Sequence, residues 1–222
     1  MKSMVRLFVL MFCFASLHGQ ERRTILATGD SITEGGAQKC YRPYLARMIG
    51  EAGLDVEFIG PKIDKADGSR HAGYSGKNAE QVLAEYARFH REYPADIVLI
   101  HAGHNHVAEE KPVPGILKAT VAMIGSAREA NPRVAVLLAQ VIPSGKLPKY
   151  AYLPDLNREL AKLAKRLNRP EQPVIVVDQE RGFDWKKDAV ADQVHPNGTG
   201  AEKMASKWFE ALKPLLGKRL RE

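Results

Sequence analysis

The chain has 222 residues, of which 45% are hydrophobic and 27% are charged, and its formal net charge is +7 at pH 7. This length allows one ordinary hydrophobic core and is too short for two generous ones, so we expect a single domain. Aromatic residues make up only 7% of the sequence and do not alternate with the basic ones, so composition does not support nucleic-acid binding. The basic surplus would equally fit an affinity for acidic polysaccharide.

The first nineteen residues have the pattern of a secretory signal peptide. Lys2 and Arg6 come before an apolar run over residues 7–17, and this run is too short to cross a bilayer. We therefore expect a signal peptide over residues 1–19, a secreted or periplasmic protein, and no stable membrane insertion after cleavage. A retained N-terminal anchor is the alternative. Cleavage would reduce the basic residues from 33 to 31 against 26 acidic ones, a net charge of +5.

Cleavage would also leave Cys40 as the only cysteine, because Cys13 lies within the apolar run. The mature chain could then form no internal disulfide, and its core would have to hold the fold even in an oxidising compartment. We expect Cys40 to be a small buried side chain rather than a reactive thiol.

Strand-like and helix-like segments alternate along the rest of the chain. Short apolar runs bounded by Gly, Pro or polar residues predict β-strands, and apolar residues at helical spacing predict helices between them. Residues 62–77 and 178–197 lack such periodicity and are expected to be mostly loop. The expected strands cover residues 25–28, 55–60, 96–100, 134–142 and 174–177, and the expected helices cover residues 41–53, 78–93, 114–130, 154–167 and 198–212.

This alternation indicates the fold class. Wholly apolar strands separated by helices are typical of a parallel sheet that is buried on both faces. We therefore predict a three-layer α/β/α sandwich around a five-stranded parallel sheet, forming one domain over residues 20–222. The sequence contains no internal repeat, low-complexity tract or linker, and nothing in it points to an oligomeric state.

A serine follows the first predicted strand, at the edge where open α/β sheets hold their ligands. Ser31 could act there as a nucleophile, but a serine needs a base and a group that orients the base. On its own, Asp30-Ser31 would fit a helix N-cap or a turn equally well.

Asp192 and His195 are candidates for the two missing partners. An Asp three residues before a His, in a turn with Pro196 and Gly198, can fold its carboxylate back onto the imidazole. That hydrogen bond would fix the ring tautomer and stabilise the imidazolium that forms when the ring takes a proton. A surface turn with an incidental ion pair is the alternative.

Two further polar loops follow predicted strands at the same sheet edge. Gly76, in the loop over residues 71–78, can offer an unobstructed backbone N–H, and Asn105, in the loop over residues 101–106, carries a side-chain amide. A backbone N–H together with an amide donor can stabilise a tetrahedral oxyanion.

These segments resemble the sequence blocks of the SGNH or GDSL-type hydrolases. A single short motif would be weak support, whereas four in order over residues 24–200 are specific. The opening Gly-Asp-Ser-Ile-Thr-Glu-Gly, the loop over residues 71–76 and the segment over residues 195–200 are similar to the bacterial carbohydrate-esterase branch, which removes acetyl groups from polysaccharides. The four blocks are GDSIT at 29–33, YSG at 74–76, GHN at 103–105 and DQVHPNG at 192–198.

The resemblance implies a flavodoxin-like serine esterase that needs no metal or organic cofactor. Ser31 would attack the ester carbonyl, His195 would take its proton and return it to the leaving alcohol, and Asp192 would orient His195. The oxyanion would be held by the backbone N–H groups of Ser31 and Gly76 and by the side chain of Asn105. The implied partner is an acylated small-molecule or polysaccharide substrate.

Four residues near these blocks are the expected substrate contacts. Tyr74 and Trp185 could stack on sugar rings, although Trp185 could equally cover the sheet edge. Asp30 and His104 complete the set. Glu34 and Glu80 are expected to be solvated or capping carboxylates.

The chain departs from the family pattern at His106, where the family usually has Asp directly after the asparagine. That Asp chiefly supports neighbouring loops, so the change leaves open how Asn105 is placed. The loop also contains three histidines that could bind a metal, His101, His104 and His106. However, no cysteine or carboxylate at ligand-like spacing follows before Glu109, and we expect no metal site.

The sequence thus predicts a serine esterase that deacetylates carbohydrate. A lipase or thioesterase for longer acyl chains is a first alternative, which short loops and the lack of an added apolar lid disfavour. A catalytically weak carbohydrate-binding protein is a second, suggested by His106 and the basic surplus. A glycosidase with paired carboxylates would leave Ser31, Asn105 and His195 without a role.

Overall fold

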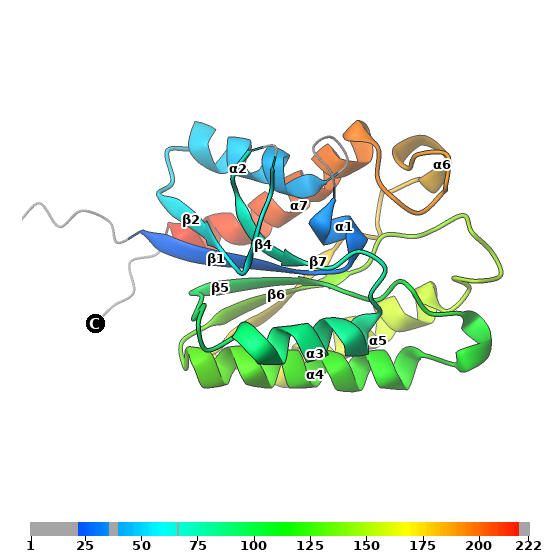
Figure 1. Ribbon diagram of the computed structural model, residues 1–222, viewed down its shortest axis with the longest axis horizontal. Coiled ribbons are helices and arrows are strands. Elements are labelled where there is room, and N and C mark those ends of the chain that lie inside the picture. The colour runs from blue at the N-terminus through cyan, green and yellow to red at the C-terminus, as the bar shows by residue number, and fades with distance from the viewer. Residues whose placement is uncertain (1–21, 36–39, 66, 218–222) are drawn as a thin grey trace, which may run out of the picture.

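The computed structural model describes residues 22–35, 40–65 and 67–217, and the expected signal peptide lies outside them. Helices cover both faces of a central sheet (Figure 1). Helices α2 (Tyr41–Glu51) and α7 (Gly198–Leu216) pack together on one face. Helices α3 (Ala79–Phe89), α4 (Val113–Ala130) and α5 (Leu153–Leu167) lie on the other. The predicted three-layer α/β/α fold is confirmed.

All five predicted strands are present and parallel. Strand β1 (Arg23–Gly29) pairs with β2 (Val56–Ile59) on one side and with β5 (Ile97–His101) on the other. Strands β6 (Ala135–Gln140) and β7 (Val174–Asp178) continue the sheet beyond β5. Their carboxyl ends therefore meet at one edge of the sheet, as the order β2-β1-β5-β6-β7 requires.

Successive residues of the central strands enter different layers of the core. In β1, Leu26 packs into the cluster beneath α3, α4 and α5, whereas Ile25 and Ala27 pack into the cluster beneath α2 and α7. Val98 and Leu99 of β5 divide in the same way. Because both faces of the sheet are buried, the sequences of these strands are continuous apolar runs.

The sheet has two short strands that the sequence did not predict. Both lie in the segment over residues 62–77 that was expected to be a loop, and that expectation was wrong for them. Strand β4 (Arg70–Gly73) pairs in parallel with the end of β1, and β3 (Lys62–Ile63) pairs antiparallel with β4. Their sequences show no alternation of apolar and polar residues, because polar side-chain contacts hold them in place.

The remaining elements are short and surround the sheet edge. They are α1 (Ser31–Glu34), the 3-10 helix η1 (Ala108–Glu110) and α6 (Trp185–Asp188). Cys40 is buried and free, as expected, and its Sγ caps the amino end of α2. Across the part of the chain that the structure describes, no helix is long and apolar enough to span a membrane.

Candidate active site

Ser31 begins α1 directly after β1 and is half-buried at the carboxyl edge of the sheet. The Asp30 side chain caps this helix by accepting a hydrogen bond from the Ile32 N–H at 2.9 Å. Gly29 is required before it, because a Cβ there would lie 2.1 Å from the His101 carbonyl oxygen. The tight approach of β1 to β5 thus fixes where the serine hydroxyl projects.

The turn over residues 192–195 brings a histidine and a carboxylate to Ser31. His195 Nε2 lies 2.8 Å from Ser31 Oγ, although the two residues are 164 positions apart. His195 Nδ1 lies 2.6 Å from Asp192 Oδ2. The other oxygen of Asp192 accepts the backbone N–H groups of Val194 and His195 at 2.9 and 3.0 Å, which folds the turn around the carboxylate.

This connectivity decides what each group can do. With Nδ1–H donated to Asp192, Nε2 is free to accept the Ser31 proton. Burial raises the pKa of Asp192. Hydrogen bonds from the backbone and ring of His195 and from the Val194 N–H have the larger combined effect, so the pKa is below its usual value. A carboxylate held ionised beside the ring favours the imidazolium that proton transfer would create. The three residues therefore have the order nucleophile, base and orienting group.

The loops that carry Gly76 and Asn105 are joined to each other and to the end of β1, two residues before Ser31. Tyr74 N–H donates to the Gly29 carbonyl at 2.9 Å, which joins the first loop to the end of β1. Asn105 Nδ2 donates to the Lys77 carbonyl at 3.0 Å, which joins the two loops to each other. An amide has two N–H donors, so Asn105 keeps one for a ligand. Gly76 has φ +76° and is exposed.

Two of the expected substrate contacts are corrected by their burial. Asp30 and His104 are each 1% exposed and offer no surface to a substrate. Burial raises the pKa of Asp30 to about 6. Burial, together with charge on His101 and His195, lowers the pKa of His104 to about 3. Both residues belong to the packed floor beneath Ser31, a position that their sequence neighbours could not reveal.

Within the described part of the chain, Asp30, His101 and His104 form the one group of side chains that could hold a metal. One ligand atom of each lies within 4.8 Å of the others, and the Asp30 Oδ2, His101 Nδ1 and both His104 nitrogens have no hydrogen-bond partner among the described residues. Asp30 Oδ2 and His104 Nδ1 are 3.9 Å apart, wider than the about 3.3 Å between two ligands of one tetrahedral zinc ion. Three side chains are also one fewer than a closed zinc site uses. The cluster therefore matches neither the spacing nor the ligand count of a closed zinc site.

Tyr74 and Trp185 remain partly accessible. Tyr74 lies under the Lys62 ammonium, which is 5.1 Å from the ring centroid. Trp185 packs over Gly145, where a Cβ would lie 2.3 Å from the indole ring. Trp185 also borders a shallow hollow of about 270 Å³ next to the turn over residues 192–195. The hollow is lined by Trp185, Lys186, Ala189, Val190, Ala191 and Gln193.

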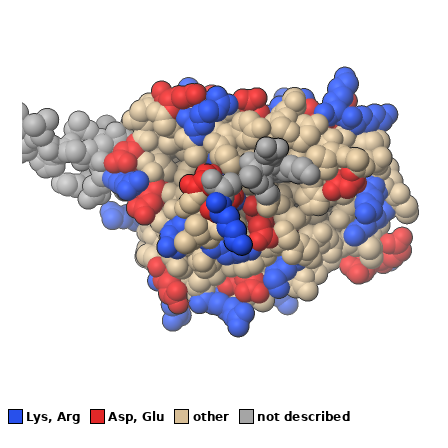
Figure 2. All heavy atoms as spheres, turned by 45° about the horizontal axis from the view of Figure 1, so that its top comes forward, with Lys and Arg blue, Asp and Glu red and all other residues tan. Residues whose placement is uncertain are grey.

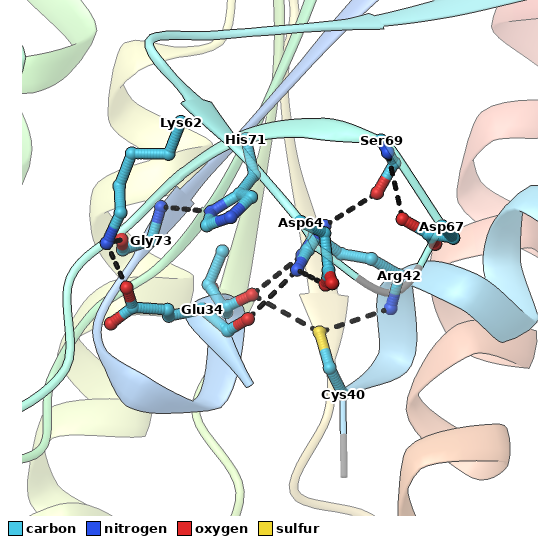
Figure 3. Close-up of polar contacts among 10 residues, drawn as sticks. Glu34, Cys40, Arg42, Lys62, Asp64, Asp67, Ser69, His71 and Gly73 are labelled. Atoms are coloured by element: carbon cyan, nitrogen blue, oxygen red, sulfur yellow. Dashed lines mark hydrogen bonds and ion pairs between the residues drawn. The ribbon is translucent and has the colours of Figure 1, made fainter. Parts of the chain in front are cut away.

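A polar network that the sequence did not reveal ties α1 to the turn between β3 and β4 (Figure 3). Arg42, only 2% exposed, donates to the carbonyls of Thr33 and Glu34 at 2.8 and 2.9 Å. The same guanidinium reaches Ser69 Oγ at 2.9 Å and Asp64 Oδ2 at 2.7 Å. Its partners lie up to 27 positions away, so no local pattern marks it.

Glu34 extends this network to the Gly76 loop. Its carboxylate accepts the Ser75 N–H at 2.5 Å and pairs with Lys62, whose ammonium also donates to the Gly73 carbonyl at 2.9 Å. Glu34 is therefore a bridge between α1 and the residue before Gly76, whereas a solvated or capping carboxylate was expected.

Comparison with known proteins places the chain among ester hydrolases. The sequence model of the GDSL-like lipase/acylhydrolase family matches residues 27–203. The chain belongs to this family. The GDSL-type hydrolase described here is therefore an esterase, as its sequence blocks predicted.

Named relatives of this GDSL-type hydrolase include carbohydrate esterases. A multidomain esterase of Ruminococcus flavefaciens is 27% identical over 223 residues, which cover 86% of this chain and only 28% of that protein. A carbohydrate esterase family 3 structure from Talaromyces cellulolyticus is 27% identical with a TM-score of 0.78, covering 87% of this chain and 98% of the other. An acetyl esterase variant crystallised with an acetate ion is 26% identical, with the same TM-score of 0.78 and the same coverage of 87% and 98%.

Proposed function

We propose that this esterase works through a Ser31–His195–Asp192 triad. The contact that carries the proposal is the 2.8 Å approach of His195 Nε2 to Ser31 Oγ, with Asp192 2.6 Å behind the ring. His195 takes the hydroxyl proton as Ser31 Oγ attacks the ester carbonyl, and then gives it to the departing alcohol. Water repeats the sequence on the acyl-enzyme, which releases the acid and restores Ser31.

The negative charge of each tetrahedral intermediate needs donors that are already in place. We assign this role to the backbone N–H groups of Ser31 and Gly76 and to the second amide N–H of Asn105. Support comes from the 3.0 Å contact of Asn105 with Lys77, which holds the amide beside the Gly76 loop. Donors fixed before the reaction stabilise the oxyanion without reorganising during it.

For the substrate we propose O-acetyl groups on carbohydrate. The support is the likeness to a carbohydrate esterase and to an acetyl esterase, each above 25% identity. Trp185 and Tyr74 offer partly exposed rings on which a sugar could pack. On the face in Figure 2, Lys and Arg are interspersed with Asp and Glu, so this face carries no single-sign stripe for a polyanion. Residues 1–19 suggest that the enzyme acts outside the cytoplasm.

The direct test is acetate release from 4-nitrophenyl acetate and from acetylated xylan, with and without Ser31. We expect Ser31→Ala to lower kcat by on the order of a millionfold, to the residual level that a serine hydrolase keeps without its nucleophile. Ser206→Ala, in the middle of α7, where the hydroxyl bonds only the Glu202 carbonyl among the described contacts, is the matched control and should keep full activity.

Two outcomes would contradict the proposal in different ways. Undiminished hydrolysis by Ser31→Ala would remove the triad. A series of nitrophenyl esters whose kcat/KM rises beyond the butyrate ester would keep the triad and replace the acetylated carbohydrate with a longer acyl substrate.

A further inference from the structure

His106 lies buried between two carboxylates directly after Asn105. Its ring is 8% exposed, with Nε2 2.9 Å from Glu80 Oε2 and Nδ1 3.1 Å from Glu110 Oε2. A neutral imidazole has a single N–H, so both contacts are hydrogen bonds only when the ring carries two protons. Glu80 and Glu110 are the charged groups that face the ring.

This contact joins the same two segments that the Asn105 amide joins. Glu80 is the second residue of α3, whose N-cap Asn78 directly follows Lys77. The Asn105 amide and the His106 ring therefore hold adjacent parts of one segment, through Lys77 O and Glu80 respectively. The Glu80 side chain is 44% exposed, and its carboxylate lies close to α4, where a Cβ on Gly115 would be 2.4 Å from Oε1.

The backbone at Asn105 has an uncommon conformation. Its φ of +67° is in the left-handed region, which asparagine tolerates better than most residues but adopts less readily than glycine. On the preceding side, Tyr152 donates its hydroxyl to the Gly103 carbonyl at 2.8 Å. The Tyr152 ring also meets the His106 ring edge-on, with centroids 6.5 Å apart at 88°. Asn105 thus lies between two anchored neighbours.

We propose that His106 is a positioning residue of the esterase, whose bridge to Glu80 and Glu110 keeps the Asn105 amide aimed at the oxyanion. The inference rests on the proposed role of Asn105 as an oxyanion donor. It also gives His106 a function that a carboxylate at the same position could not perform, since Glu80 and Glu110 would repel it.

A double-mutant cycle tests this on kcat for 4-nitrophenyl acetate. Removing one oxyanion donor costs a hydrolase on the order of a hundred- to a thousandfold, and we expect that loss for Asn105→Ala. His106→Ala should lower kcat by on the order of ten- to a hundredfold, because misplacement of about 1 Å is that costly, while KM changes little. The variant with both changes should match Asn105→Ala to within about twofold, because His106 acts only through Asn105.

Charge exchange provides a second readout that does not depend on His106→Ala folding well. His106→Asp should be less active than His106→Ala, because it adds a third carboxylate to the cluster. Combining His106→Asp with Glu80→Lys restores opposite charges across the same contact and should recover part of the lost kcat. Glu109→Gln is the control, because Glu109 is exposed and lies beside Glu110 in η1. Its activity should match that of the wild type.

Each contrary result has its own meaning. Wild-type kcat in His106→Ala, or losses that multiply in the double variant, would overturn the positioning role while leaving the triad intact. Full activity in Asn105→Ala would overturn both the donor assignment and this inference, and Ser31→Ala would still decide whether the chain is a serine esterase.

Discussion

Asp192 uses its two oxygens for different tasks, and a substitution can separate them. One oxygen folds the turn by accepting the N–H groups of Val194 and His195, and the other holds the His195 ring. Asp192→Asn keeps an acceptor for the turn but presents an N–H to Nδ1, which favours the wrong ring tautomer. We expect kcat to fall about ten-thousandfold, which is the loss that the same change causes in the catalytic triad of a serine protease. The melting temperature should change little.

The measurement is kcat and thermal unfolding of Asp192→Asn beside Asp155→Asn. Asp155 pairs only with Arg158 on the exposed surface of α5 among the described contacts, so its variant should keep both values. A loss of kcat that simply follows a loss of folded protein would contradict the tautomer argument.

Short local motifs in the sequence predicted which side chains meet at the candidate site. Ser31, Asp192 and His195 stand in short turns where spacing alone indicates which groups can meet. Burial is not readable in the same way. Asp30 and His104 sit next to site residues in sequence, yet their side chains turn into the protein interior, so the expectation that they contact substrate was wrong.

Helix α1 is held in place by hydrogen bonds from a residue of α2. Arg42 of α2 donates to the Thr33 and Glu34 carbonyls at the end of α1 and to Asp64 beyond β3. Arg42→Met fills similar space but leaves buried carbonyls without their donors. Because unsatisfied buried groups and broken buried ion pairs are costly, we expect a loss of about 3 to 5 kcal/mol in the free energy of unfolding.

Urea denaturation of Arg42→Met beside Arg47→Met checks this. Arg47 lies on the same helix but is half exposed, and it pairs with Glu51 and Glu202 at the surface. Its loss should cost about 1 kcal/mol or less. Equal losses for the two variants would mean that the buried network contributes no more than a surface ion pair.

The Arg42 network also explains which elements could not be predicted. The five parallel strands and the long helices have apolar faces that repeat at fixed spacing, so their existence follows from local sequence. Strands β3 and β4 contain Lys62, Arg70 and His71, and they are held by contacts distant in sequence, namely the ion pair of Lys62 with Glu34 and the pairing of β4 with β1. Such contacts become visible only once the chain is folded.

For the whole molecule, burial of histidines in the sheet edge sets the response to acid. Burial lowers the pKa of His71 and of His101 from 6.5 to about 4, and that of His104 to about 3. His71 also accepts the Gly73 N–H at Nδ1, a bond that its protonation would break. Stability from these three groups is present above about pH 6.5 and is lost as the pH falls towards their folded values.

Asp30 acts in the opposite direction, because its pKa rises from 3.8 to about 6. Near pH 5 the unfolded chain therefore binds about three more protons on the histidines and about one fewer on Asp30, a net excess of about two. The free energy of unfolding should then fall by about 2 to 3 kcal/mol for each pH unit of acidification. Urea titrations between about pH 4.5 and 6 measure this slope.

His71→Asn makes the prediction specific. The asparagine oxygen can still accept the Gly73 N–H, but it takes up no proton, so the slope should decrease by about 1.4 kcal/mol per pH unit. His90→Asn provides the comparison, because His90 is also buried but stands at the end of α3, where it pairs with Glu129. An unchanged slope in His71→Asn would mean that acid unfolds the esterase through other groups. A decrease in His71→Asn alone would link acid sensitivity to the strand that precedes the Gly76 loop.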